Sequence, residues 1–475
     1  MPRTRGIVAG ATAWAATGLA FAVSAFSLPI DDFWLSLASA REIALGADPS
    51  RAITLTWTPM QADALNPQWG AQVILGLGGT LGWALAVNAA LIAAGLGLTA
   101  LRVAQRASSR SSAIALLLAI GVIAPHLLAR PQSFSIALLP LALLCLERAR
   151  GRLWLPLAYG LLIAVWANLH GAFVIGQLAA AAAFIGSGFD RRSGPMIMAL
   201  TALLALVAPL ANPAGPALLA YAFTQPASDV IRAISVEWQP AWPWIPVATA
   251  YWAYLLLLVP GRLAPPRGRP GELVLLLLLA LLAASSIRHI PWFVLASAPL
   301  LASDVDRMLA ARPSLGRAIG QVGGPLGDAR APIVVAAALV VTLVFQSIRP
   351  ALPESLGRLT PDEPVAVAEA LANQVEAGSR TPILNEQVWG GYLAWRLGDR
   401  VRTAMDGRIE IRSRQTWVEY FALMHGEQDP AARLDRAGVR WAALAPHRES
   451  LVRELQDAGW ALELATDRAV LLRAP

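Results

Sequence analysis

An acidic pair, Asp31-Asp32, follows the first long apolar run of the chain. A carboxylate in a cleft can take the proton of a hydroxyl group, which is the task of a general base. Two arginines, Arg130 and Arg288, stand at the ends of later apolar runs, and a guanidinium group holds a phosphate through two parallel hydrogen bonds. These residue types predict proton abstraction together with phosphate binding.

Other polar side chains stand at the ends of apolar runs in the same way, and three of the five histidines are among them. Polar groups next to hydrocarbon cost free energy unless they face a cavity or one another. We therefore predict that they line an outward-facing cleft that binds the substrate. The predicted binding residues are Arg130, Asn168, His170, Glu237, Arg288, His289 and His126.

Structural interpretations compete with these assignments. Asp31-Asp32 are also placed to cap a helix that begins at Phe33. Arg130 and Arg288 are also placed to reach lipid headgroups from helix ends, although arginine at an outer face runs against the positive-inside bias. We favour function for the acidic pair and for both arginines.

Several other residues favour a structural reading. Glu237 suits a solvated loop, and Asn212-Pro213 suits a turn. The aromatic stretch 238–252 suits a membrane-interface belt more than a sugar platform. Asp304, Asp306 and the arginines of the inner loops read as solvated charges.

A divalent cation is a further expectation at the predicted cleft. Asp31, Asp32, His170 and Glu237 are the candidate ligands. A set rich in carboxylate oxygens favours Mg or Mn.

The composition indicates whether water or lipid surrounds most of the chain. Of 475 residues, 56% are hydrophobic and 15% are charged, and the mean hydropathy is +0.54, whereas soluble domains carry about 25% charged residues. The net charge of +7 comes from arginines spread over short loops rather than one stripe, which excludes a nucleic-acid interface. The chain is predicted to be a multi-pass membrane protein.

About eleven apolar segments have the character of membrane helices. They cover residues 7–28, 83–104, 111–128, 133–147, 153–168, 171–188, 195–210, 243–260, 271–287, 291–303 and 331–347. Arginines gather in every second connection, which places those connections and the N-terminus in the cytoplasm. Between the first two helices lies a long outer loop, 29–82, whose apolar part 69–81 is too short to span and reads as an interfacial helix.

After the last apolar segment, the sequence pattern changes to that of short strands and helices. Strands are predicted at 381–385, 401–404, 441–445 and 469–473, and helices at 361–377, 386–397, 414–424 and 448–458. The sequence thus predicts an all-α transmembrane domain, 1–348, and a small extracytoplasmic α/β domain, 349–475.

The pattern resembles the GT-C superfamily of membrane glycosyltransferases, to which the aminoarabinose transferase of lipid A belongs. Asp31-Asp32 match the catalytic acid that this superfamily carries in its first outer loop, and 66–72 resemble its interfacial helix. An uncharacterised bacterial group within it has similar motifs. These are Arg130-Pro131-Gln132, Trp166-Ala167-Asn168-Leu169-His170-Gly171, Asn212-Pro213, Trp389-Gly390-Gly391-Tyr392-Leu393 and Asp406-Gly407-Arg408.

The resemblance implies a hexosyl or pentosyl transferase of the bacterial inner membrane. The donor would be a polyprenyl-phosphate-linked sugar, and the acceptor an extracytoplasmic glycan, lipid or protein. The sequence lacks the acceptor motif of oligosaccharyltransferases, which argues against protein N-glycosylation. In the tail, Trp389–Trp395 reads mainly as core and 406–408 as a tight turn.

Two other classes remain open. A lipid or polysaccharide transporter or flippase also has many helices and buried polar groups, but it usually shows internal repeats with sites at mid-membrane. A non-enzymatic envelope assembly protein would use the tail to bind a partner. Clustering of the polar turn residues favours the enzyme, and scattering around the rim favours the assembly protein.

Overall fold

The computed structural model describes residues 28–148, 151–189, 194–225, 228–263, 268–311 and 363–475. The predicted helices 7–28 and 331–347 and the predicted boundary after 348 lie outside these ranges. Contacts divide the chain into two compact units. The helical unit contains Thr80–Pro350, and the mixed unit joins Leu28–Gly79 to Ala351–Pro475. The prediction had placed residues 28–79 in the helical domain, whereas their contacts are with the C-terminal domain.

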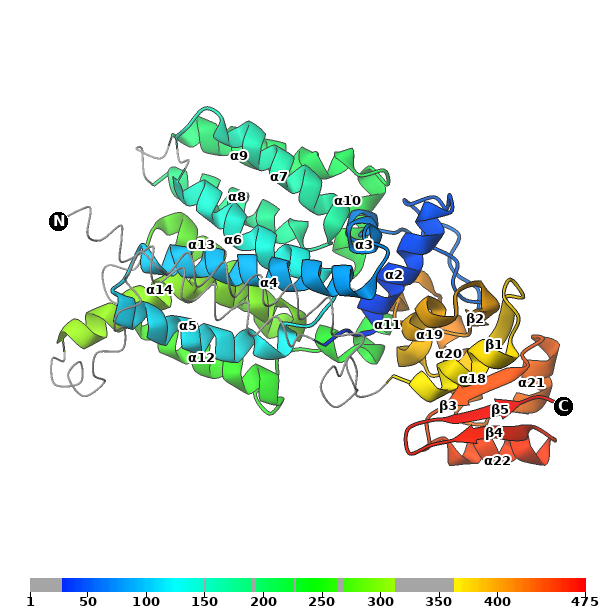
Figure 1. Ribbon diagram of the computed structural model, residues 1–475. Coiled ribbons are helices and arrows are strands. Elements are labelled where there is room, and N and C mark those ends of the chain that lie inside the picture. The colour runs from blue at the N-terminus through cyan, green and yellow to red at the C-terminus, as the bar shows by residue number, and fades with distance from the viewer. Residues whose placement is uncertain (1–27, 149–150, 190–193, 226–227, 264–267, 312–362) are drawn as a thin grey trace. The chain divides into compact units, whose positions relative to one another are not determined.

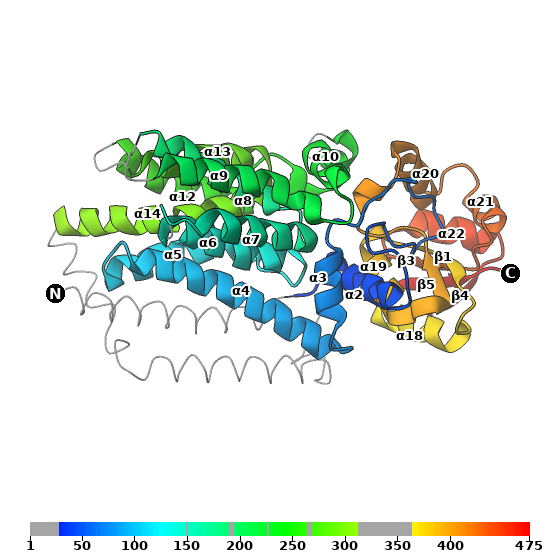
Figure 2. The same ribbon diagram turned by 90° about the horizontal axis from the view of Figure 1, so that it is seen from above.

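The helical unit is built from long apolar helices joined by short turns. They are α4 (Leu81–Ala104), α5 (Ser109–Ile123), α6 (Gln132–Arg148), α7 (Leu155–Leu169), α8 (Phe173–Ser187), α9 (Pro195–Val207), α10 (Pro216–Thr224), α11 (Asp229–Ile234), α12 (Pro246–Leu263), α13 (Pro270–Ser285) and α14 (Ile290–Ala311). The longer ones run side by side in alternating directions (Figures 1 and 2). The predicted segments between 83 and 303 each match one of them, while α10 and α11 lie in what was predicted as loop.

Two of the described helices are long and apolar enough to cross a membrane, Leu81–Ala104 and Ser109–His126. A third span results if the pair Pro195–Ala211 and Pro216–Thr224, bent by 103°, is counted as one. Four further apolar stretches of helix in the described residues are shorter than 18 residues, namely Leu155–Leu169, Phe173–Ser187, Pro246–Gly261 and Pro270–Ser285. The predicted count of about eleven spans therefore remains a prediction.

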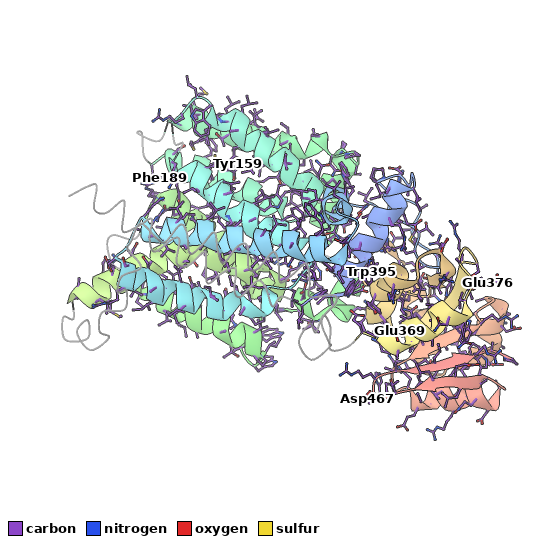
Figure 3. All side chains as sticks on the ribbon, in the orientation of Figure 1. Tyr159, Phe189, Glu369, Glu376, Trp395 and Asp467 are labelled. Atoms are coloured by element: carbon purple, nitrogen blue, oxygen red, sulfur yellow. The ribbon has the colours of Figure 1, made fainter. Side chains whose placement is uncertain are left out.

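Small residues let the helices approach closely. A Cβ at Gly95 of α4 would overlap the main-chain oxygen of Ile136 in α6. The hydroxyl of Tyr159 in α7, labelled in Figure 3, donates to the carbonyl of Gly176 in α8 at 2.8 Å. Both contacts are typical of membrane helices. Such helices associate through close packing and interhelical hydrogen bonds, because the hydrophobic effect does not drive them together in lipid.

The mixed unit contains a five-stranded sheet of order β2-β1-β3-β5-β4. Its strands are β1 (Thr381–Asn385), β2 (Val401–Thr403), β3 (Trp441–Leu444), β4 (Ala461–Ala465) and β5 (Val470–Arg473). β1 pairs in parallel with β2 and β3, whereas β5 pairs antiparallel with β3 and β4. The small α/β domain predicted for the tail is confirmed.

The helices of the tail connect these strands. They are α18 (Val365–Gln374), α19 (Gly390–Leu397), α20 (Arg414–Met424), α21 (Pro430–Arg436) and α22 (Glu449–Asp457). The crossovers from β1 to β2 and from β2 to β3 run in opposite directions across the sheet. Right-handed connections therefore put α19 on one face and α20 with α21 on the other. The prediction missed α21 and β4, whose residues are mostly exposed.

The segment 28–79 adds α2 (Asp31–Ala44) and α3 (Trp69–Gly76) to the mixed unit. Leu35 and Ala38 of α2 pack with Ala394 of α19 in one apolar cluster. The ring of Trp34 lies 4.6 Å from that of Trp395, which Figure 3 labels. The segment predicted as the first outer loop is therefore part of the core of the C-terminal domain, and a helix is present where the interfacial helix 69–81 was predicted.

Candidate functional site

Because the helices alternate in direction, the turns α5–α6, α7–α8 and α13–α14 and the segment before α12 lie at one end of the helical unit (Figure 1). We call it the polar end. It is formed by 126–133, 168–170, 237–238 and 288–289. The prediction that residues far apart in sequence come together here agrees with two contacts. Arg130 Nη1 lies 2.6 Å from Glu237 Oε1, and the Arg288 guanidinium lies 4.3 Å from the Trp238 ring centre.

Arg130 is the central cation of the polar end, although only 3% of it is exposed. Its Nη1 is taken by Glu237. Its Nε and Nη2 are buried and have no hydrogen-bond partner among the described residues. These two nitrogens form one edge of the guanidinium plane, the edge that receives two oxygens of a phosphate or carboxylate. The side chain is thus held on one side and unoccupied on the other.

More buried polar atoms without a partner belong to the same turns. In the described part of the chain they are His126 Nε2, the side-chain amide of Gln132, Ser133 Oγ and His289 Nδ1. A buried polar group left without a hydrogen bond costs about 1–3 kcal/mol, so such groups are rare in folded proteins. Their concentration in 126–133 and at 289 indicates a site built for a polar ligand.

His170 is held as a neutral ring. Trp166 Nε1 donates to Ser135 Oγ at 2.7 Å, and Ser135 Oγ lies within hydrogen-bond distance of His170 Nδ1, at 2.8 Å. The Ala172 N–H also points at Nδ1, at 3.2 Å. Nδ1 is therefore an acceptor, and the ring proton sits on Nε2. Burial, followed by the charges of Arg288 and Arg130, lowers the pKa of His170 to about 3.

Asn168 fastens two turns to each other. Its Oδ1 accepts from Asn212 Nδ2 at 3.1 Å, and its own Nδ2 donates to the Ala164 carbonyl at 2.8 Å. Asn212 Oδ1 in turn accepts from the Ala214 N–H at 2.9 Å. The turn-setting role predicted for Asn212-Pro213 agrees with this, and Asn168 shares that role alongside its predicted place in the binding site.

Glu237 is not the solvated loop charge that the structural reading of the sequence predicted. Burial alone would raise its pKa, but Arg130 and Arg288 outweigh burial and lower the pKa to about 2. A carboxylate that remains ionised beside two guanidinium groups is a weak base at neutral pH. Glu237 therefore holds Arg130 in place rather than taking a proton.

The acidic pair lies in the mixed unit, in the first turn of α2, which begins at Asp31 rather than Phe33. Asp31 Oδ1 accepts the Gly391 N–H and Oδ2 accepts the Gly407 N–H, both at 2.6 Å. Burial raises the pKa of Asp31 well above its usual range, and the charges of Asp406 and Asp32 add to the rise. The Gly391 N–H acts in the opposite direction. A raised pKa suits a base, because basicity increases with pKa.

The residues of the two tail motifs stabilise the fold of the C-terminal domain. Asp406 is fully buried and pairs with Arg408 at 2.6 Å and with Arg412 at 3.2 Å. The Arg408 N–H donates to Asp406 Oδ1 at 3.0 Å, which closes the predicted turn over 406–408. Trp389 and Tyr392 are buried, as the core reading of Trp389–Trp395 requires.

The residues present do not fit the expected cation. Among the described residues no group of three or more His, Cys, Asp or Glu is arranged to hold a metal ion. His170 Nδ1 is occupied by two donors, and Glu237 is neutralised by arginines. We derive no step through a metal.

Sequence reasoning missed an ionic cluster at the other end of the helical unit. Arg102 of α4 and Arg106, just after its end, pair with Glu147 of α6 at 2.8 and 3.1 Å, and Arg106 pairs with Glu272 of α13 at 2.6 Å. Arg102 is 4% exposed. The reading of the inner arginines as solvated charges is wrong for these two. Arg102 lies one turn inside an apolar helix, and that was the available signal.

Asp304 and Asp306 were also read as solvated charges. Asp304 pairs with Arg307, and its side chain is 11% exposed. Asp306 Oδ1 accepts from the Ser111 hydroxyl at 2.8 Å and from the Ser108 N–H at 3.3 Å. Asp306 thus connects α14 to the start of α5, whereas Asp304 pairs within α14.

No protein-family model matches the chain, and no curated protein does. The fold is similar to that of two solved structures of ArnT, which agrees with the resemblance predicted from the sequence. It is similar to ArnT from Cupriavidus metallidurans in the apo state, with 14% identity, a TM-score of 0.54, and 97% of this chain and 96% of that chain covered. The likeness extends to ArnT bound to undecaprenyl phosphate, with 13% identity, a TM-score of 0.53 and 97% of both chains covered.

Proposed function

We propose that this protein is an inner-membrane glycosyltransferase that moves a sugar from a polyprenyl-phosphate donor to an extracytoplasmic acceptor. The observation that carries the proposal is the unoccupied edge of the Arg130 guanidinium in a buried, polar helix end. The shared fold supports it, since ArnT has been seen bound to undecaprenyl phosphate. In this proposal the N-terminus is cytoplasmic and the C-terminal domain extracytoplasmic.

The donor phosphate binds at the polar end. Arg130 receives two phosphate oxygens through Nε and Nη2, while Glu237 keeps the guanidinium plane fixed. Arg288 adds a second positive charge. In a buried site these charges stabilise the negative charge that develops on the leaving phosphate. The neutral Nε2–H of His170 and the ring of His126 are further donors.

The acidic pair supplies the base. Asp31 or Asp32 takes the proton of the acceptor hydroxyl as its oxygen attacks the anomeric carbon. The bond from that carbon to the phosphate oxygen breaks, and polyprenyl phosphate leaves with the electron pair. The attack is in line, so the configuration at the anomeric carbon inverts. A positioned general base contributes about 10²–10⁴-fold to the rate.

The clustering at the polar end also weighs on the other two classes. The contacts of Arg130 with Glu237 and of Arg288 with Trp238 join two turns to the segment before α12, which argues against a purely structural assembly role. The candidate binding residues lie at helix ends rather than within the helices, unlike the mid-membrane sites typical of transporters.

Arg130→Lys tests the phosphate site in purified protein in lipid nanodiscs, offered a panel of radiolabelled polyprenyl-phosphate sugars. Lysine keeps the charge but lacks the two-nitrogen edge, so we expect donor binding about 10-fold or more weaker, which corresponds to about 1.4 kcal/mol. Arg148→Lys, at an exposed arginine at the end of α6, is the matched control. Equal binding by wild type and Arg130→Lys, or no binding by either, would overturn the proposal.

The base is tested in the same system with Asp31→Asn combined with Asp32→Asn. We expect donor binding to persist while the release of polyprenyl phosphate and the transfer of labelled sugar stop. Transfer at the wild-type rate by the double variant would exclude the acidic pair as the base.

A further inference from the structure

Side chains of helix α2 form hydrogen bonds with the main chain at both ends of α19. At the start of α19, the Asp31 carboxylate accepts the Gly391 N–H at 2.6 Å. At its end, Arg41 donates to the carbonyls of Ala394 and Trp395 at 3.0 and 3.1 Å. First-turn N–H groups and last-turn carbonyls have no partner inside a helix, and acids and bases at the respective ends also match the helix dipole. α2 is thereby fixed in position along α19.

The second Asp31 oxygen is held from a different element. Oδ2 accepts the N–H of Gly407, in the turn that Asp406 and Arg408 close. The two N–H groups come from the two tail motifs singled out in the sequence, 389–393 and 406–408. One carboxylate of the first outer loop is thus held by both motifs of the C-terminal domain.

Glycine is required at both positions by contact rather than by backbone angle. A Cβ at Gly391 would overlap Asp31 Oδ1 and lie 2.6 Å from the Asp31 main-chain oxygen. A Cβ at Gly407 would overlap Asp31 Oδ2, and the next two nearest atoms also belong to the Asp31 side chain. Neither glycine is among the described residues with positive φ. An added methyl group at Gly407 therefore acts first on Asp31.

We propose that Gly391 and Gly407 are positioning residues, whose N–H groups set the place and protonation of the Asp31 carboxylate. The inference rests on the proposed function and deepens it, because it gives the C-terminal domain a part in the transfer reaction. Hydrogen bonds from N–H groups favour the ionised form that can accept a proton. The charged groups around Asp31 are Asp406, Asp32 and Glu363, which disfavour that form, and Arg408, which favours it.

Gly407→Ala is the test, with Asp31→Ala and the double variant completing a cycle. The first measurement is the unfolding temperature of the full-length protein in detergent. Gly407→Ala should lower it when Asp31 is present and by much less in the Asp31→Ala background, where the methyl group meets no carboxylate. Additive losses would show that Asp31 and Gly407 do not interact and would overturn the inference.

The second measurement is the pH profile of transfer, using the polyprenyl-phosphate sugar that wild type turns over. In Gly407→Ala the carboxylate is displaced, so we expect kcat about 10- to 100-fold lower, an unchanged KM for the donor, and an acid limb shifted to higher pH. Gly438→Asn is the control, since this exposed glycine has φ +69° and no atom within 4 Å of an added Cβ, and asparagine tolerates that backbone conformation.

The two measurements separate the possible failures. If wild type transfers sugar and the stability effects are coupled, but kcat and the pH profile of Gly407→Ala equal those of wild type, the contact is structural and the positioning role is wrong. If wild type transfers no sugar from any donor of the panel, the proposed function fails, and with it the role in transfer. The stability cycle still decides whether the carboxylate and the two motifs interact.

Discussion

Arg102 Nη1 donates to the main-chain carbonyl of Leu295 at 3.0 Å. Leu295 lies in the middle of α14, four residues before Pro299. Proline has no N–H, so it leaves the carbonyl four residues earlier without its helical partner. A buried arginine from α4 fills that gap, and its other nitrogens pair with Glu147. One side chain thereby joins α4, α6 and α14.

Replacing Arg102 with methionine should destabilise the helical unit. The change keeps an unbranched apolar stem but leaves the Leu295 carbonyl without a donor and Glu147 with one arginine fewer. Breaking a buried pair on one side costs about 3–5 kcal/mol. We expect a clearly lower unfolding temperature in detergent than for wild type. Arg148→Met, at an exposed arginine of α6, controls for the loss of charge, and equal stability of the two variants would contradict the role.

Hydrophobic periodicity predicted the elements whose pattern is local. The strand at 381–385 and the helix at 414–424 have the predicted bounds. β4 was missed because Ala461–Ala465 is an edge strand with little buried surface. Its strand character comes from pairing with β5 rather than from its own sequence.

The candidate site was predictable only in part. The arginine bias of the loops placed His126, Arg130 and His170 at the same end, because topology alone decides which turns share an end. The pairing of Arg130 with Glu237 is not encoded locally, as 107 residues separate them. Nor does any pattern within 28–79 show that this loop folds with the tail. That follows from contacts such as Asp31 with Gly391, 360 residues apart.

The ion pair of Glu237 with Arg130 should make the stability of the protein depend on pH in the acidic range. The folded pKa of Glu237 is about 2, below the unfolded value of about 4.3. The pair therefore stabilises the protein above about pH 4.3, and this contribution is lost as the pH falls toward 2. We expect the difference in unfolding temperature between wild type and Glu237→Gln to be constant from pH 7 to about 5 and to shrink below that. A difference as large at pH 3 as at pH 7 would contradict the low pKa.

Burial of neutral His170 should also make the stability of the protein fall as the pH is lowered. Its folded pKa is about 3, whereas the unfolded imidazole has a pKa of about 6.5. Below about pH 6.5 the unfolded chain binds a proton that the folded one does not, so stability falls as the pH is lowered. His170→Gln should flatten this dependence between about pH 6.5 and 4. His425→Gln, at an exposed histidine, controls for the loss of an imidazole, and an unchanged slope in His170→Gln would argue against a buried neutral ring.

Arg412 should hold the first outer loop on the C-terminal domain. Its Nη2 donates to Thr56 Oγ1 at 2.9 Å and its Nη1 to Asp406 Oδ1 at 3.2 Å. Arg408 and Arg412 hold the pKa of the Asp406 carboxyl far below its usual range despite burial, which on its own would raise it. Arg412→Met leaves that buried charge with one partner and Thr56 with no donor from Arg412.

We therefore expect hydrogen exchange across residues 51–58 to become faster in Arg412→Met, because local opening no longer breaks these bonds. Exchange in the helices of the helical unit should remain as in wild type. Arg414→Met changes an exposed arginine two residues away and should leave 51–58 protected. Equally slow hydrogen exchange of 51–58 in both variants would contradict this role of Arg412. The loop would then be held by its apolar contacts, such as those of Leu55 and Ile53 with Ala394.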